Sequence, residues 1–191
     1  MGHGEAKKWL AQNPVPEEVL LIDLSHDFRW KENFIYGLPE LNKNQIQQSK
    51  RIANPGCFAT AIQLALLPLA KLQLIQDEVH IHAITGSTGA GQSLQATSHF
   101  SWRNSNISVY KAFEHQHLAE INQSLKTLQS DLSKPLNFIP VRGDFTRGIF
   151  ASVYTPCDWT EHALRELYDD YYKDAPFTVP TNVNPHLKQV V

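Results

Sequence analysis

Apolar and polar positions along the first third of this 191-residue chain predict one strand and two helices. The continuous apolar run at 19–24 is typical of a buried parallel strand, with polar residues just past its carboxyl end. Residues 5–12 have a short helical pattern, and residues 58–72 have a longer apolar one in which Pro68 is expected to end or kink the helix. The segment 29–50 is polar, and we expect it to be irregular.

The rest of the chain predicts strands and helices in a different order. Its patterns indicate strands at 78–84, 138–141 and 148–155, a helix at about 115–129 and an amphipathic helix at 160–173. A polar stretch lies at 92–108, and the Pro-rich tail ends like a strand at 189–191. The order of elements predicts an α/β segment followed by an α+β domain.

Composition and charge argue against several classes of partner. Lys and Arg total 17 against 19 Asp and Glu, and no basic run is dense enough to follow a phosphate backbone, so nucleic acid is not expected as a partner. No apolar run reaches the roughly 18–20 residues that cross a bilayer. The start of the chain lacks the layout of a signal peptide. We therefore expect a cytoplasmic protein whose cysteines, Cys57 and Cys157, are free thiols.

Cys57 has the sequence setting of a reactive thiol. It follows the turn residues Asn54, Pro55 and Gly56 and opens an apolar helix. The N–H groups and positive dipole end of a helix N-terminus favour a thiolate and can stabilise an oxyanion that forms beside the sulfur. The alternative is a small buried hydrophobic residue, which is the usual state of a free cysteine. Cys157 has no such setting and is interpreted as structural.

The segment 114–121 offers a proton-transfer partner for a thiolate. His115 and His117 stand at the start of a predicted helix, and Glu120, three residues after His117, shares its helical face. A carboxylate there could fix the tautomer and orientation of the imidazole, as in a catalytic triad. The alternative is a solvated or hydrogen-bonded surface histidine, which the clustering makes less favourable.

His80 and His82 share one face of a predicted strand. This spacing can bind zinc, but no further ligand lies at a compact distance in the sequence, so we do not expect a metal site.

Two loops could bind anions or a nucleotide. Arg142 and Arg147 flank a tight loop and could hold a carboxylate or phosphate bidentately, although each taken singly is typical of a surface arginine. The loop 86–91 could cradle a phosphate or a nicotinamide ribose, with a flexible loop as the alternative. Its candidate residues are Gly86, Ser87, Gly89 and Gly91.

Six motifs occur in an order that points to one family. They are LSHDFR (24–29), YGLPEL (36–41), NPGC (54–57), GSTGAG (86–91), HQHLAEI (115–121) and TRGI (146–149). Together they make nearly the whole chain resemble the N-acetyl-gamma-glutamyl-phosphate reductase family of the arginine pathway. The nucleophile of that family falls on Cys57.

The resemblance implies a fold and a reaction. The fold is an α/β remnant followed by an α+β domain with a mixed sheet, like the C-terminal domain of glyceraldehyde-3-phosphate dehydrogenase. The Cys57 thiolate would attack the acyl phosphate of N-acetyl-glutamyl 5-phosphate and release phosphate, and NADPH would reduce the thioacyl enzyme to the semialdehyde. A homo-oligomer is also implied.

The resemblance also implies roles for the residues already singled out. His117, held by Glu120, would be the acid/base, with His115 as the second candidate. Arg142 and Arg147 would anchor substrate anions, and the glycine-containing loop 86–91 would lie against the NADP cofactor.

The chain departs from the family pattern at both ends. The glycine-rich Rossmann turn that opens the family's nucleotide domain and the strand and helix that close its core have no counterpart in this sequence. We therefore expect residues 1–56 to be the end of an NAD(P)-binding domain and residues 57–191 to be a truncated catalytic and dimerisation domain. We expect this polypeptide alone to have little or no NADPH-dependent activity.

Two other functions stay open from the sequence. A cysteine hydrolase or acyltransferase could use Cys57, His117 and Glu120 without a nucleotide. A non-catalytic dimerisation module could simply pack the cysteine. Within the reductase interpretation, the sequence leaves open an acetyl, succinyl or carrier-linked substrate and the choice of NADP over NAD.

Overall fold

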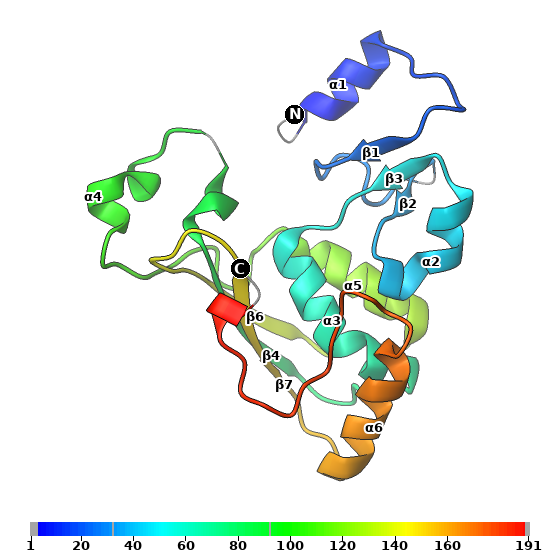
Figure 1. Ribbon diagram of the computed structural model, residues 1–191, viewed down its shortest axis with the longest axis vertical. Helices are drawn as coiled ribbons and strands as arrows, with labels where there is room; N and C mark the ends of the chain where they lie inside the picture. Colours follow the sequence, from blue (N-terminus) through cyan, green and yellow to red (C-terminus); the bar gives the residue numbers. More distant parts are fainter. Residues whose placement is uncertain (1–3, 32, 92, 190–191) are drawn as a thin grey trace. The chain divides into compact units, whose positions relative to one another are not determined.

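The computed structural model describes residues 4–31, 33–91 and 93–189 (Figure 1). The chain forms two compact units that divide between Thr60 and Ala61. Helix α3 (Cys57–Lys71) begins in the first unit and continues into the second.

The first unit is a small parallel α/β unit. Its strands have the order β1 (Leu21–Asp23), β3 (Arg51–Ala53), β2 (Ile35–Tyr36), and both outer strands run parallel to β3. Its helices are α1 (Glu5–Gln12) and α2 (Pro39–Gln48). The helix expected at 5–12 and the parallel strand expected within 19–24 are confirmed.

The expected burial of the apolar run at 19–24 is wrong. Val19, Leu20, Ile22 and Leu24 are between 44% and 67% exposed. A parallel strand is buried only when both faces of its sheet are covered, and the described part of the first unit leaves these side chains uncovered. The strand itself still forms because its backbone pairs with β3.

The segment 29–50 is also different from our expectation, because it is ordered as β2 and α2 rather than irregular. None of the residues of α2 is buried, so the helix has no apolar stripe that a periodicity search could detect. Its sequence signal is Pro39 in the first turn, a position where proline is favoured because that N–H has no partner within the helix.

The second unit is built on a mixed sheet. Its strands have the order β5 (Ser108–Val109), β6 (Leu136–Arg142), β4 (Val79–Thr85), β7 (Ile149–Tyr154). Strands β4 and β6 pair in parallel, and β5 and β7 pair with them antiparallel. The helices are α4 (Phe100–Arg103), α5 (His117–Leu128), α6 (Glu161–Tyr172) and the short η1 (Ser87–Ala90), η2 (Ala96–Ser98) and η3 (Leu187–Gln189). The α+β domain with a mixed sheet is confirmed.

The core of this unit lies on one face of the sheet, where α3 and α5 lie beside one another (Figure 1). Alternate residues of β4 point into it, so that Val79, Ile81 and Ala83 are at most 2% exposed. The helices contribute the fully buried side chains Ile62, Leu66, Leu67, Ile121 and Leu125. Burying each such side chain contributes about 1.5–3 kcal/mol, which fixes α5 and its N-terminus on the sheet.

The polar stretch and the tail of this unit contain short helices. The stretch 92–108 contains η2, α4 and the start of β5. At the tail, Gln189 ends η3 rather than opening a strand. The other two residues of the expected strand, 190 and 191, lie outside the described residues.

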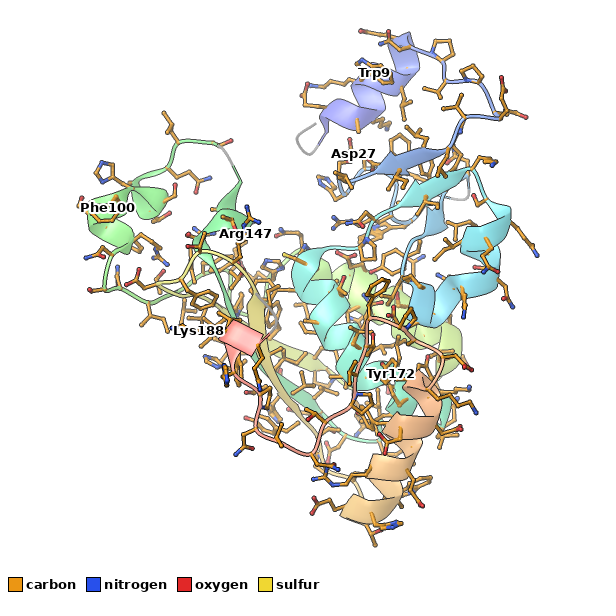
Figure 2. The ribbon with its side chains drawn as sticks, in the orientation of Figure 1. Trp9, Asp27, Phe100, Arg147, Tyr172 and Lys188 are labelled. Atoms are coloured by element: carbon orange, nitrogen blue, oxygen red, sulfur yellow. The ribbon has the colours of Figure 1, made fainter. Side chains whose placement is uncertain are left out.

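Helix α3 continues past Pro68 to Lys71 instead of ending there. Proline has no N–H, so the carbonyl of Leu64, four residues earlier, loses its helical donor. The hydroxyl of Tyr172, which lies on α6 (Figure 2), donates to this carbonyl. The hydroxyl of Tyr168, also on α6, donates to the next carbonyl, that of Ala65. The two tyrosines therefore supply hydrogen bonds at the turn where proline interrupts α3.

This arrangement makes the cost of Tyr172→Phe dependent on residue 68. In the native sequence the substitution removes the donor to Leu64 and is expected to lower the free energy of unfolding by about 1–2 kcal/mol. In a Pro68→Ala background the restored N–H of residue 68 serves the carbonyl, and the same substitution should cost clearly less. A double-mutant cycle in urea measures the difference. Equal costs in the two backgrounds would show that the tyrosine does not compensate for the proline.

Candidate active site

The residues before Cys57 are fixed at the carboxyl ends of the parallel strands. Strand β3 ends at Ala53, and the N–H of Asn54 donates to the carbonyl of Asp23 at the end of β1, with an N···O distance of 2.8 Å. The Arg29 Nε donates to the Asn54 carbonyl at 2.9 Å. The sequence motifs at 24–29 and 54–57 are thus joined by hydrogen bonds.

Cys57 is the first residue of α3, and its side chain is exposed. The Gly56 carbonyl accepts the N–H of Thr60 at 2.8 Å, which is the first hydrogen bond of the helix. The positive end of the helix dipole favours a thiolate at this position. Cys57 is therefore not the small buried residue that the sequence left as the alternative.

His117 and Glu120 lie together in the first turn of α5. The distance from His117 Nε2 to Glu120 Oε1 is 3.8 Å, and the two side chains are 9% and 1% exposed. A buried carboxylate at this distance can stabilise the imidazolium that forms when the ring takes up a proton. The expected shared helical face is therefore present, and it is shielded from water.

His115 has a different environment. Its ring Nδ1 accepts the backbone N–H of His117 at 3.2 Å, so the ring caps the start of α5 and its neutral form carries the proton on Nε2. Burial, with a smaller contribution from the positive charge of Lys111, lowers the pKa of His115 to about 4. The ring is consequently neutral at pH 7.

The depressed pKa of His115 predicts a loss of stability in mild acid. The folded pKa of about 4 lies below the ordinary value of 6.5, so the unfolded chain takes up the proton first as the pH falls. The stability contribution of the neutral ring is intact above pH 6.5 and is lost progressively toward pH 4. We expect a loss of about 1–2 kcal/mol, smaller than complete burial would give because solvent screens part of the charge.

Urea unfolding at pH 7, 5.5 and 4.5 measures this dependence. A His115→Gln variant should be less stable at pH 7 but should lose less stability between pH 7 and 4.5. The control is His162→Gln, because His162 is exposed on α6. An unchanged pH slope in the His115 variant would contradict the assignment.

Tyr110 connects the histidines to Arg142, and the sequence did not identify it. Its ring lies 5.8 Å from the His115 ring between centroids, and the guanidinium carbon of Arg142 lies 4.8 Å from its centroid. The chain after β5 stays beside β6, since the N–H of Tyr110 donates to the Pro140 carbonyl. The available sequence signal was the short alternation of apolar and polar residues at 107–110.

The glycine-containing loop 86–91 packs against the loop between β6 and β7. The N–H groups of Gly86, Ser87 and Thr88 donate to carbonyls at 148, 145 and 146, respectively. A Cβ added to Gly86 would lie 2.6 Å from the Thr146 carbonyl oxygen, so only glycine fits without a shift of the backbone. The two loops therefore hold each other, and Arg147 lies exposed in the second (Figure 2).

This packing changes what loop 86–91 can offer a ligand. Its remaining glycine N–H groups are also engaged: that of Gly89 donates to Gly86, and that of Gly91 donates to Thr88. The cradle of N–H groups expected from the sequence is therefore occupied by contacts within the protein. A ligand could instead meet the Ser87 hydroxyl and the open side of Gly91, where an added Cβ would meet nothing within 4 Å.

The second unit thus brings most of the candidate residues into two connected groups. One group runs from Arg142 through Tyr110 and His115 to the pair His117 and Glu120, and the other comprises loop 86–91 with the loop that carries Arg147. Cys57 belongs to the first unit.

The other sequence candidates have ordinary surroundings. His80 stacks on Tyr154 with 5.2 Å between ring centroids, and His82 is exposed. Among the described residues, no group of three His, Cys, Asp or Glu side chains could hold a metal ion. Over the same residues, no helix has the length and apolar character needed to cross a membrane.

Two family profiles match this chain. The profile described as semialdehyde dehydrogenase, dimerisation domain, matches residues 57–191. The profile described as semialdehyde dehydrogenase, NAD binding domain, matches residues 1–49.

Curated relatives are similar over the whole chain. A protein of Parabacteroides distasonis named N-acetyl-gamma-glutamyl-phosphate reductase is 56% identical over 192 residues, which are 99% of this chain and 60% of the relative. A protein of the same name from Christiangramia forsetii is 55% identical over 100% of this chain and 60% of its own length. The chain thus spans about 60% of the length of these relatives.

Solved structures share the fold at low identity. Aspartate semialdehyde dehydrogenase II from Vibrio cholerae aligns with a TM-score of 0.60 at 17% identity, over 95% of this chain and 63% of that one. The enzyme from Francisella tularensis aligns with a TM-score of 0.63 at 14% identity, over 90% of this chain and 61% of that one.

Proposed function

Because this chain belongs to the semialdehyde dehydrogenase family, we propose that it carries the acyl-accepting machinery of an N-acetyl-gamma-glutamyl-phosphate reductase, an enzyme of arginine biosynthesis. The observation that carries the proposal is Cys57, exposed at the N-terminus of α3. The substrate class comes from the names of relatives that are more than 50% identical to this chain. In this proposal residues 1–56 are the end of the NAD(P)-binding domain, and residues 57–191 are the catalytic and dimerisation domain.

The first chemical step is acyl transfer to sulfur. The Cys57 thiolate attacks the acyl carbon of N-acetyl-glutamyl 5-phosphate, the S–C bond forms, and the C–O bond to phosphate breaks with release of inorganic phosphate. The helix N-terminus favours both the thiolate and the oxyanion that develops on the acyl oxygen. The product is a thioester on Cys57.

His117 is our choice for proton transfer. Its ring has a carboxylate 3.8 Å away at Glu120, which can stabilise the cation as a proton arrives. His115 is the second candidate, but its pKa of about 4 and its capping bond to α5 make it a weak base at neutral pH. In this scheme His115 positions the start of α5, from which His117 projects.

The substrate anions are assigned to Arg142 and Arg147. Arg142 is half-buried against Tyr110 and therefore has a restricted position, whereas Arg147 is exposed in the loop that follows β6. Guanidinium groups suit this task because they bind carboxylate or phosphate oxygens bidentately.

We assign NADPH as the cofactor of the whole enzyme. A bound nicotinamide cofactor supplies the hydride that converts the thioester to the aldehyde. Gly86, Ser87, Gly89 and Gly91 remain our candidates to face it, chiefly through the Ser87 hydroxyl and the open side of Gly91. The free thiols suit a cytoplasmic location.

A second copy of the chain is proposed to cover the outer face of the mixed sheet. On this face β7 exposes Phe150 and Tyr154, and Phe113 is exposed on the segment beside β6. Large apolar side chains gathered on one sheet face are typical of protein interfaces. The matching dimerisation-domain profile supports this homo-oligomer.

The test of the function is a single-turnover experiment without NADPH. The chain is mixed with excess N-acetyl-glutamyl 5-phosphate, and inorganic phosphate is followed over time. We expect a burst close to one phosphate per chain followed by slow release, because the thioester accumulates when no hydride donor is present. Steady hydrolysis without a burst would instead favour the cysteine hydrolase alternative.

A further inference from the structure

Arg103 and Arg142 form a pair of guanidinium groups beside the candidate site. Arg103 ends α4 and is 5% exposed. Its Nη1 donates to the Arg142 carbonyl at 2.9 Å, and its Nη2 donates to Ser108 Oγ at 3.0 Å. Since Ser108 and Arg142 are partners in the pairing of β5 with β6, Arg103 is anchored to the edge of the sheet.

Aromatic rings restrict both guanidinium groups. The guanidinium carbon of Arg103 lies 4.8 Å from the Trp102 ring centroid, and that of Arg142 lies 4.8 Å from the Tyr110 ring centroid. Stacking of this kind holds a guanidinium in place without neutralising its charge.

The positive charge of this pair is poorly compensated. Burial and the charge of Arg142 lower the pKa of Arg103, and the opposing contribution comes from Asp144. Asp144 itself accepts the N–H of Ser105 through Oδ2 at 2.6 Å. No described residue accepts a hydrogen bond from the buried Nε of Arg103 or of Arg142.

Arg142 is the member of the pair that can meet a ligand. Over the described residues its guanidinium makes neither a hydrogen bond nor an ion pair, and the side chain is half-buried. Its Nε is fully buried, whereas its two terminal nitrogens are not, so these two atoms remain within reach of solvent. A partly buried, unpaired cation is costly unless an anion compensates it.

We propose that Arg103 and Arg142 form a binding site for an oxyanion group, carboxylate or phosphate, of a small anionic ligand. Arg142 contacts the ligand through its terminal nitrogens, and Arg103 is a positioning residue that fixes the Arg142 backbone and adds a second positive charge. The inference deepens the proposed function and rests on it, since an N-acyl-glutamyl phosphate carries both kinds of oxyanion.

The test measures ligand binding calorimetrically on a Cys57→Ser background, where acylation cannot occur. The probes are N-acetyl-L-glutamate, which has carboxylates only, and inorganic phosphate. We expect the Kd of at least one probe to rise about 10-fold or more in Arg142→Met and Arg103→Met. The control Arg165→Met should leave it unchanged, because Arg165 is an exposed arginine paired with Glu161. A rise in the Kd of N-acetyl-L-glutamate identifies a carboxylate site, and a rise in the Kd of inorganic phosphate identifies a phosphate site.

Lysine variants, which retain the positive charge, distinguish a binding role from a purely structural one. Arg103→Lys and Arg142→Lys retain the cation but lose the planar fork, so folded protein should show a weakened and more salt-sensitive Kd. Unchanged affinity for both probes in these folded variants would overturn the proposal, as would no binding of either probe to the parent.

The phosphate burst of the unsubstituted chain separates this inference from the proposed function. Arginine-dependent binding without a burst would contradict the reductase proposal and leave the anion site standing. A burst together with arginine-independent binding would contradict the anion site alone.

Discussion

Replacing Cys57 by serine is expected to abolish the phosphate burst, with the rate of acyl transfer falling at least about 10³-fold. The hydroxyl of serine has almost the size of the thiol, but it stays protonated near neutral pH, so the helix N-terminus no longer stabilises a reactive anion. The experiment follows phosphate release from N-acetyl-glutamyl 5-phosphate in matched samples of the two proteins.

The matched control is Cys157→Ser. Cys157 is the other free thiol and is only half-buried, so a nonspecific thiol reaction would involve it as readily as Cys57. We expect the full burst in this variant. A burst that survives in Cys57→Ser and disappears in Cys157→Ser would show that the nucleophile is Cys157 and not Cys57.

Replacing His117 by asparagine is expected to slow acyl transfer by about 10²–10³-fold at pH 7. The amide cannot carry a proton, whereas the imidazole beside Glu120 can. The loss should shrink as the pH rises, because the Cys57 thiol then ionises without assistance. The burst rate measured from pH 6 to pH 9 gives this profile.

Two further variants divide the roles among the neighbours of His117. Glu120→Gln keeps the shape of a fully buried side chain but removes its charge, so it should produce a smaller loss with the same pH trend. His115→Asn should alter stability more than the burst rate, because His115 caps α5. A His115 variant as inactive as the His117 variant, while still folded, would exchange the two assignments.

Much of the fold could be predicted because its elements obey simple periodicities. The strands β4 and β6 and the helices α3 and α5 each bury one face against the same core, and their apolar spacing shows this directly. In β7 and α6 the less exposed residues also recur at the spacing of a strand and of a helix. Helix α2 escaped prediction for the opposite reason: it buries none of its residues and leaves no apolar stripe. The burial expected for the run at 19–24 failed because burial depends on what covers a sheet, which the strand's own residues do not encode.

The candidate site, like the fold, could be predicted from the sequence only in part. Local spacing was enough to place His117 and Glu120 on one helical face and Cys57 at a helix start. The capping role of His115 rests on a hydrogen bond to the backbone two residues later, which the pattern of apolar positions does not reveal. The bridging position of Tyr110 depends on packing of the chain against β6, which the short alternation at 107–110 does not specify. The loop 86–91 shows the limit most clearly, since its glycines allow close backbone packing that consumes the N–H groups expected to bind a ligand.

The most direct test of the central claim is to locate the acyl group on the protein. The chain is incubated with N-acetyl-glutamyl 5-phosphate in the absence of NADPH, quenched in acid, digested and analysed by mass spectrometry. Our account predicts an N-acetyl-glutamyl thioester on the peptide that contains Cys57, released by hydroxylamine and absent from the peptide that contains Cys157. An unmodified Cys57 peptide after phosphate has been released would contradict it.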